Sequence, residues 1–408
     1  MLYRSIKSKF FASAEAEKLS LLGFGMMRLP VIKTESGLED IDTPKATELI
    51  DYALQCGINY FDTAWPYHEG QSEPFLGEVL VERHPRDSFY LATKLPLWEI
   101  DTVEQAELLF SKQLNKLRVE YFDFYLMHAI DGERLDHIVR TGILQWAIDL
   151  QKAGKIKHLG FSFHGTNEDL SRVIAAHNWD FGQLQLNYLD WELQKAGTAY
   201  EMLVSADVPV MVMEPVRGGK LASLVPQAEK ILKCVQPEKS IASWAFRFVA
   251  ELPGVVTVLS GMTTLDQLKD NLDTFSAPEN ELKLSQEERD ALEEALKESK
   301  LASVVPCTAC KYCMPCPRKV DIAGVFGSYG AYKAGGSDFA YKMGLKALGE
   351  DALADSCVDC GVCTPLCPQK IDIPKEMKEI AQETADLLSV DEQRAQRAQL
   401  MEARTECS

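Results

Sequence analysis

The chain has 408 residues, of which 46% are apolar, and its formal net charge is −18. This length and composition predict a folded protein with one large and one smaller domain, while the acidic balance disfavours nucleic acid and anionic lipid surfaces, because both repel negative charge. No apolar run approaches the roughly 18 residues of a membrane span and the N-terminus lacks the apolar core of a secretory signal, so we expect no membrane partner and a cytoplasmic location.

Eight short apolar segments alternate with helical patterns over the first 300 residues. Because they are rich in Val, Ile, Phe and Tyr, they predict strands at residues 19–25, 58–64, 88–95, 121–129, 156–163, 181–187, 208–215 and 254–260. In the helical pattern at residues 43–57, Thr43 can cap the N-terminus, Pro44 suits the first turn and Gly57 can end the helix.

The nearly continuous apolar character of these segments is typical of parallel strands that are covered on both faces. Eight such strands alternating with helices predict an α/β fold, a (β/α)8 TIM barrel. A doubly wound open sheet is the alternative. It would require Gly-x-Gly-x-x-Gly after the first strand, whereas GFGMMRLP at residues 23–30 has only the first two glycines before a proline.

Polar side chains occupy the C-terminal ends of the predicted strands, where barrel enzymes place their chemistry. They are Asp62, Lys94, His128, Ser162, Gln183, Glu214 and Ser260. Tyr67 lies on the loop that follows Asp62. Taken singly, each such residue is more often part of a core or of an ordinary ion pair. Together they predict a proton-donating site, because an ammonium lowers the pKa of a neighbouring phenol and an aspartate holds the ammonium in place.

The motifs around these residues resemble those of the aldo/keto reductase family. They are DTAWPY at 62–67, ATK ending at Lys94, LMH ending at His128, GFS ending at Ser162, QLQLNYLD from Gln183 and EPVRGGKL from Glu214. The resemblance implies a barrel oxidoreductase that transfers hydride between a nicotinamide coenzyme and a small carbonyl substrate, an aldehyde or ketone. It also implies a general acid at Tyr67, tuned by Lys94 and Asp62, and a carbonyl-orienting residue at His128.

The same resemblance implies a row of coenzyme contacts along the barrel mouth. These are Ser162 and Gln183 for the carboxamide, Glu214, Arg217, Gly218 and Gly219 for the pyrophosphate, and Ser260, Gly261, Met262, Gln267 and Asn271 for the adenosine end. NADP-preferring relatives carry basic residues on this last loop to bind the 2′-phosphate, whereas here only Lys269 is nearby. Both NADP and NAD are therefore candidate coenzymes. Phe163 replaces the asparagine that is common in the family, and His68, His164, Trp65 and Trp98 are pocket candidates.

Cysteine placement divides the chain. Nine of the 11 cysteines lie beyond residue 300, and the helical pattern at 283–300 precedes them, so we expect a barrel domain at 1–300 and a second domain at 301–408. Eight of them form two runs, Cys307-x2-Cys310-x2-Cys313-x2-Cys316-Pro and Cys357-x2-Cys360-x2-Cys363-x3-Cys367-Pro. The second run matches that of bacterial ferredoxins, which predicts two 4Fe-4S clusters, with zinc as the alternative.

In two-cluster ferredoxins the fourth cysteine of each run binds the other cluster. This implies one ligand set of Cys307, Cys310, Cys313 and Cys367 and another of Cys357, Cys360, Cys363 and Cys316. Helical patterns follow both runs and fill the spacer, so the domain resembles an α-helical ferredoxin; a tail helix is expected at 374–403 and a free surface thiol at Cys407.

Two functions follow from this combination. The first is an aldo/keto reductase-like enzyme of anaerobic metabolism whose clusters exchange electrons with a ferredoxin or flavoprotein partner. The second is an electron-transfer or redox-sensing protein that uses the barrel as a scaffold without reducing carbonyl compounds. The sequence leaves the oligomeric state open.

Overall fold

A computed structural model describes residues 1–7, 9, 16–33, 39–301, 304–333, 337–349 and 352–385. The chain divides into two compact units, one formed by Met1–Ser223 and Leu232–Leu292 and the other by Leu224–Ile231 and the residues from Glu293 onward. The expected boundary after residue 300 stays a prediction. Among the described residues, no helix has both the length and the apolar character needed to cross a bilayer.

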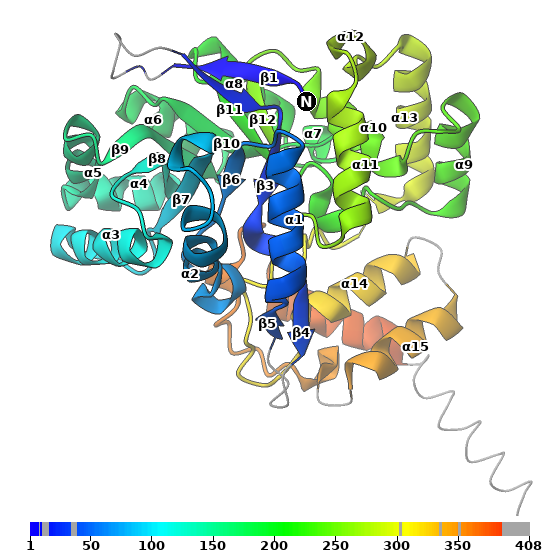
Figure 1. Ribbon diagram of the computed structural model, residues 1–408. Helices are drawn as coiled ribbons and strands as arrows, with labels where there is room; N and C mark the ends of the chain where they lie inside the picture. Colours follow the sequence, from blue (N-terminus) through cyan, green and yellow to red (C-terminus); the bar gives the residue numbers. More distant parts are fainter. Residues whose placement is uncertain are drawn as a thin grey trace, which may run out of the picture. The chain divides into compact units, whose positions relative to one another are not determined.

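Eight parallel strands of the first unit close into a barrel (Figure 1), which confirms the predicted TIM barrel. In barrel order they are β3 (Leu22–Gly25), β6 (Tyr60–Asp62), β7 (Tyr90–Pro96), β8 (Phe122–Ile130), β9 (Ile156–Phe163), β10 (Phe181–Gln185), β11 (Val210–Met213) and β12 (Val255–Ser260). Each overlaps one predicted segment. The register of β10 against β9 places Gln183 beside Ser162, so two predicted site residues are neighbours.

Amphipathic helices follow the strands in alternation. They are α1 (Thr43–Gln55), α2 (Ser72–Leu76), α3 (Val103–Leu117), α4 (Gly132–Arg140), α5 (Ile143–Lys152), α6 (Asn167–Ala176), α7 (Asp190–Leu193), α8 (Ala196–Ser205), α9 (Pro226–Val235), α10 (Ile241–Ala250), α11 (Leu265–Ser276), α12 (Glu279–Leu282) and α13 (Gln286–Ser299). The apolar faces of α1 to α8 and α10 to α12 and the outward faces of the strands form one hydrophobic cluster, which holds the strand ends in place.

The cap predicted for α1 is wrong by one residue. The N-cap is Asp42, whose carboxylate accepts a hydrogen bond from the backbone N–H of Lys45, and Thr43 is already helical. Both residue types cap helices well, so the local sequence did not separate them. Pro44 lies in the first turn as predicted, and Gly57 follows the helix with a left-handed φ of 89°.

Two antiparallel hairpins were not predicted. β1 (Tyr3–Ile6) pairs with β2 (Glu17–Ser20), and β4 (Val31–Lys33) pairs with β5 (Glu39–Ile41). The single strand predicted at 19–25 is therefore two, because Ser20 turns the chain: its N–H donates to Asn59 Oδ1 at 2.7 Å and its hydroxyl to the carbonyl of Leu22 at 2.7 Å.

The first hairpin fills the barrel interior from one end. Ile6 and Leu19 pack in a cluster with inward-facing residues of the barrel strands, including Tyr60, Phe124 and Met211. Since these partners lie near the N-terminal ends or middle of their strands, the C-terminal strand ends are left for polar residues.

The second unit is helical in its described part. It contains α14 (Ile322–Lys333), α15 (Asp338–Leu348) and a helix that begins at residue 373 and continues to the last described residue, 385. Its apolar core includes Val325, Phe326 and Met377, and Cys363 is buried with them. The predicted α-helical ferredoxin-like fold is confirmed, whereas the rest of the expected tail helix and Cys407 lie outside the described residues.

The contact between α2 and α3 gives a test of how closely the barrel helices are packed. A Cβ added at Gly77, which follows α2, would fall far inside van der Waals contact of the backbone carbonyl oxygen of Lys116 in α3. Backbone cannot yield as a side chain can, so we expect Gly77→Ala to destabilise the barrel by about 1–3 kcal/mol in urea unfolding. Gly327→Ala in α14 is the control, because nothing lies within 4 Å of the added Cβ; equal losses in both variants would contradict the packing argument.

Candidate active site and candidate iron–sulfur ligands

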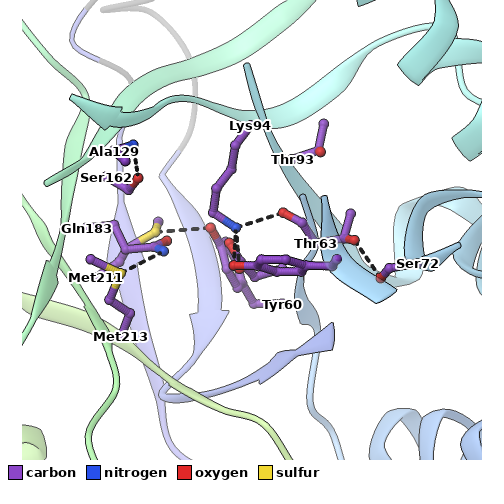
Figure 2. Close-up of polar contacts among 12 residues, drawn as sticks. Tyr60, Thr63, Ser72, Thr93, Lys94, Ala129, Ser162, Gln183, Met211 and Met213 are labelled. Atoms are coloured by element: carbon purple, nitrogen blue, oxygen red, sulfur yellow. Dashed lines mark hydrogen bonds and ion pairs between the residues drawn. The ribbon is translucent and has the colours of Figure 1, made fainter. Parts of the chain in front are cut away.

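Lys94 lies at the centre of the candidate active site and is 1% exposed. Near the end of β7, its ammonium donates to the carbonyl oxygen of Thr63 at 2.7 Å (Figure 2). It also donates to Asp62 Oδ1 at 2.6 Å and to the hydroxyl of Tyr67 at 3.3 Å. His128, near the end of β8, is also buried, and its ring centroid lies 6.5 Å from that of Tyr67. The structure thus brings the four residues expected for catalysis into one group.

Burial and charge act in opposite directions on this group. Burial lowers the pKa of Lys94, whereas the carboxylates of Asp62 and Glu73 raise it. Burial also raises the pKa of Asp62, and Lys94 lowers it. A hydrogen-bonded buried pair at 2.6 Å is best described as ammonium and carboxylate, because each charge compensates the desolvation of the other.

The electrostatics of His128 are different. Its pKa lies well below the ordinary value, first because it is buried and then because the basic side chains of Lys94, His164 and Arg134 are nearby. The imidazole is therefore neutral at pH 7, and a neutral imidazole offers one N–H donor and one acceptor nitrogen. Such a group can orient a carbonyl oxygen by hydrogen bonding without releasing a proton.

A second layer of polar residues supports Lys94, and sequence reasoning missed it. The carboxylate of Glu73, at the start of α2, is fully buried and accepts from Thr93 Oγ1 at 2.8 Å and Gln113 Nε2 at 2.6 Å. Gln113 Nε2 also donates to the carbonyl oxygen of Lys94 at 3.0 Å, and Ser72 hydrogen-bonds Thr63. Glu73 closely follows the DTAWPY motif, but its sequence environment resembles that of any exposed helix-start glutamate.

Ser162, near the end of β9, and Gln183, in the middle of β10, lie side by side, as their expected role requires (Figure 2). Ser162 Oγ accepts from the backbone N–H of Ala129 at 2.8 Å, and Gln183 Nε2 lies 3.6 Å from the sulfur of Met213. The buried Oε1 of Gln183 has no hydrogen-bond partner among the described residues. An orphaned amide oxygen of this kind fits the N–H donors of a carboxamide.

The loop after β11 contains Glu214, Arg217, Gly218 and Gly219, all with left-handed φ values. Arg217 is fully buried, and its Nε donates to Asp190 Oδ2 at 3.0 Å. Its Nη1 and Nη2 have no partner among the described residues, so the guanidinium retains donors for an anion.

Asp190 anchors this loop and was not singled out in the sequence, although it lies within the QLQLNYLD motif. Its Oδ2 also accepts from Gln185 Nε2 and Asn187 Nδ2, both at 2.8 Å. Asn187 in turn donates to the carbonyl oxygen of Glu214 at 3.1 Å. This network joins the ends of β10 and β11.

Most of the residues expected to bind the adenosine end of the coenzyme already form hydrogen bonds or packing contacts with other residues of the protein. Asn271 Nδ2 donates to Ser260 Oγ at 3.0 Å, and Gln267 Oε1 accepts from the N–H groups of Thr263 and Thr264 as part of the cap of α11. Met262 packs in the hydrophobic core, so only its backbone is left for a ligand. Gly261 lies against the side chain of Arg28, whose guanidinium is 3.9 Å from the carboxylate of Glu214.

The pocket candidates are also placed. His68 Nε2 accepts from the backbone N–H of Leu29 at 3.2 Å, and the Trp65 ring stacks under the ammonium of Lys116 at 3.6 Å. Trp98 lies against His128, with ring centroids 4.8 Å apart, and His164 follows β9. Phe163 is buried, so its side chain packs in the core, where it offers no polar contact.

The cysteines of the second unit are grouped across the two runs. Burial raises the pKa of Cys313 to about 12, with further contributions from the neighbouring thiols of Cys310, Cys307 and Cys367. The pKa of Cys363 is likewise raised by burial and by nearby Cys357 and Cys316. Each fourth cysteine therefore lies near the other run, as in the expected crossed sets.

The environment of these thiols fits a polynuclear cation. Thiolates crowded in a partly buried site repel one another, and bound iron offsets that repulsion. Cys360 is exposed, unlike Cys363. Within the described residues, no three His, Cys, Asp or Glu side chains are arranged to hold a single metal ion.

This geometry defines a TIM-barrel oxidoreductase joined to a cysteine-rich helical domain. A family model described as "Aldo/keto reductase family" matches residues 21–297, and one described as "4Fe-4S dicluster domain" matches residues 306–372. The chain belongs to the aldo/keto reductase family and carries a 4Fe-4S dicluster domain after the barrel. Both resemblances noted in the sequence are confirmed.

Known relatives match the barrel. The chain is 24% identical over 311 residues to the uncharacterized oxidoreductase YqkF of Bacillus subtilis, covering 69% of this chain and 94% of that protein. The holo form of aldo-keto reductase AKR11C1 from Bacillus halodurans matches with a TM-score of 0.59 at 24% identity, over 72% of this chain and 96% of that one. An aldo-keto reductase from Klebsiella pneumoniae in complex with NADPH has a TM-score of 0.55 at 18% identity, over 72% and 95%. The structural likenesses show the fold.

The ion pair around Lys94 makes a prediction about pH. Asp62 raises the pKa of Lys94, so Asp62→Asn lowers that pKa and the charged ammonium is lost at lower pH. We expect the alkaline decline of kcat/KM for carbonyl reduction to move to lower pH by about one unit or more. Glu73→Gln is a matched variant with a smaller shift in the same direction, because Glu73 is a weaker influence on Lys94. A pH profile that does not move in Asp62→Asn would show that Lys94 does not control the decline.

Proposed function

We propose that the barrel catalyses hydride transfer between a nicotinamide coenzyme and an aldehyde or ketone, with Tyr67 as the proton donor. The observation that carries this proposal is the 3.3 Å contact of Tyr67 with Lys94, whose ammonium is held by Asp62 and the Thr63 carbonyl. When bound, the nicotinamide supplies or accepts the hydride.

The roles of the residues follow from their environments. As the carbonyl carbon takes up hydride, the carbonyl oxygen takes the proton from Tyr67 Oη. The ammonium of Lys94 stabilises the negative charge that then develops on the phenol oxygen, and Asp62 keeps that ammonium charged and in position. His128, neutral and buried, orients the carbonyl oxygen by hydrogen bonding.

The coenzyme would lie along the residues expected for it. Gln183 has a spare acceptor for the carboxamide beside Ser162, and the left-handed loop Arg217–Gly219 with its buried guanidinium suits the pyrophosphate. Within the loop from Ser260 to Asn271 the basic side chain is Lys269, whose ammonium lies over the ring of Tyr52 at 6.0 Å, and Arg28 lies against Gly261 of the same loop. A 2′-phosphate normally requires a cation, which Arg28 can supply beside Gly261, so the proposal keeps both NADP and NAD.

Removing the phenol hydroxyl tests the proton donor. We expect Tyr67→Phe to reduce the rate of carbonyl reduction by about two to four powers of ten, because general acid catalysis is lost. Coenzyme affinity, measured by quenching of protein fluorescence in anaerobic samples, should be almost unchanged, since Tyr67 is not assigned to the coenzyme. Wild-type turnover in this variant would show that another group donates the proton.

We further propose that the second unit holds two 4Fe-4S clusters and exchanges electrons with a ferredoxin or flavoprotein partner. The crossed sets would be Cys307, Cys310, Cys313 and Cys367 for one cluster and Cys357, Cys360, Cys363 and Cys316 for the other. This crossing is supported by the thiols that raise the pKa of Cys313, which include Cys367, and by those that raise the pKa of Cys363, which include Cys316. Bound clusters would supply one-electron transfer. Hydride transfer between a nicotinamide and a carbonyl compound does not require such one-electron steps.

Matched serine variants test the crossed ligands. Anaerobic wild-type protein should contain about eight irons and eight sulfides. Cys367→Ser should alter the same electron paramagnetic resonance signal as Cys310→Ser, although the two residues lie in different runs, and Cys316→Ser should alter the same signal as Cys360→Ser. If Cys367→Ser instead matches Cys360→Ser, the ligands are not crossed, and zinc in place of iron would remove the electron-transfer role.

The second candidate function is electron transfer or redox sensing with the barrel as a scaffold. The grouped cysteines support this function, which requires no catalytic residue in the barrel. It would be favoured if anaerobically purified protein bound no nicotinamide coenzyme while its clusters still exchanged electrons with a low-potential carrier.

A further inference from the structure

Basic and aromatic side chains lie beside His128 at the C-terminal ends of three adjacent strands. Trp98 follows β7, Arg134 lies in the first turn of α4 after β8, and His164 follows β9. None of the three has a role in the transfer of hydride or proton proposed above. Their position at the barrel mouth makes them candidates for recognising the rest of the substrate.

Arg134 is fixed next to His128 by the backbone. Its Nη1 donates to the carbonyl oxygen of Ala129, the residue after His128, at 2.6 Å, and lies 3.4 Å from Asp131 Oδ2. The guanidinium carbon lies 5.9 Å from the centre of the Trp98 ring, which itself packs on His128 at 4.8 Å. The Arg134 side chain is 29% exposed, so its other N–H groups can meet a ligand.

The carboxylates near this group are already committed. Asp62 holds Lys94. Asp131 caps α4 by accepting from the backbone N–H of Arg134 at 3.0 Å, and its other oxygen forms an ion pair with Nη1 of the same arginine at 3.4 Å. The side chains that lower the pKa of His128 electrostatically are the basic ones of Lys94, His164 and Arg134.

The planar guanidinium of arginine presents paired N–H donors whose spacing matches the two oxygens of a carboxylate. A flat apolar ring beside it can pack against the carbon framework that joins such a carboxylate to the reacting carbonyl group. We propose that the substrate is a carbonyl compound that bears a carboxylate, which Arg134 binds while Trp98 packs on the intervening carbons. This inference rests on the proposed carbonyl reduction and specifies its substrate class.

Two aldehydes of nearly equal size test it: 4-carboxybenzaldehyde and its methyl ester, which lacks the charge. We expect wild-type protein to favour the acid by about tenfold or more in kcat/KM, the value of a charge-assisted hydrogen bond. Arg134→Met should remove this preference by raising KM for the acid, while kcat/KM for the ester changes by less than about twofold. Arg134→Lys keeps the charge but not the planar fork, so it should retain part of the preference.

Arg140→Met is the matched control, because Arg140 is an exposed arginine of the same helix that is not assigned to the pocket; its preference should equal that of wild type. Dissociation constants of 4-(hydroxymethyl)benzoate give a readout independent of turnover and should rise only in the Arg134 variants. Equal use of acid and ester by wild type, or an equal loss with both aldehydes in Arg134→Met, would overturn the assignment. Reduction of neither aldehyde would instead count against carbonyl reduction and remove the basis of this inference.

Discussion

The buried ion pair between Lys94 and Asp62 is the interaction on which the barrel's chemistry depends. Two charges removed from water are costly unless each compensates the other, and here both are almost inaccessible to solvent. The surrounding polar groups reduce this desolvation cost. The carbonyl oxygen of Thr63 accepts a hydrogen bond from the ammonium, and the nearby carboxylate of Glu73 raises the pKa of Lys94. Much of the polar network around β6 and β7 is therefore the support that a charged lysine requires inside a barrel.

The barrel strands and their reactive ends could be predicted because their physical causes are local in sequence. Buried parallel strands are apolar on both faces, so Asp62, Lys94 and His128 stand out as interruptions where each strand ends. The turn at Ser20 could not be predicted in this way, since it depends on a hydrogen bond that its N–H donates to a residue 39 positions away, Asn59. The 4Fe-4S dicluster domain was predictable because its signature is the spacing of cysteines along the chain and does not depend on packing.

The sequence did not reveal in which direction some side chains point, and this limited the prediction of the site. Glu73 is a buried charge in a segment that has the composition of an exposed helix start, and only the positions of Thr93 and Gln113 reveal its environment. Met262 and Arg217 lie on loops whose side chains turn into the protein, Met262 into the core and Arg217 toward Asp190. Loop conformations with left-handed residues leave no periodic pattern from which such directions can be inferred.

The pairing of the first and last barrel strands has a consequence for biosynthesis. Leu22 in β3 lies opposite Val258 in β12, and the backbone N–H of Leu2 donates to the carbonyl oxygen of Phe275. The ribosome synthesises these segments in order. Almost 240 further residues must therefore be made after β3 before β12 can pair with its free edge. During that interval β3 presents an open edge, and the nascent chain is exposed to aggregation until β12 emerges. The cysteine runs are synthesised later still, after all eight barrel strands.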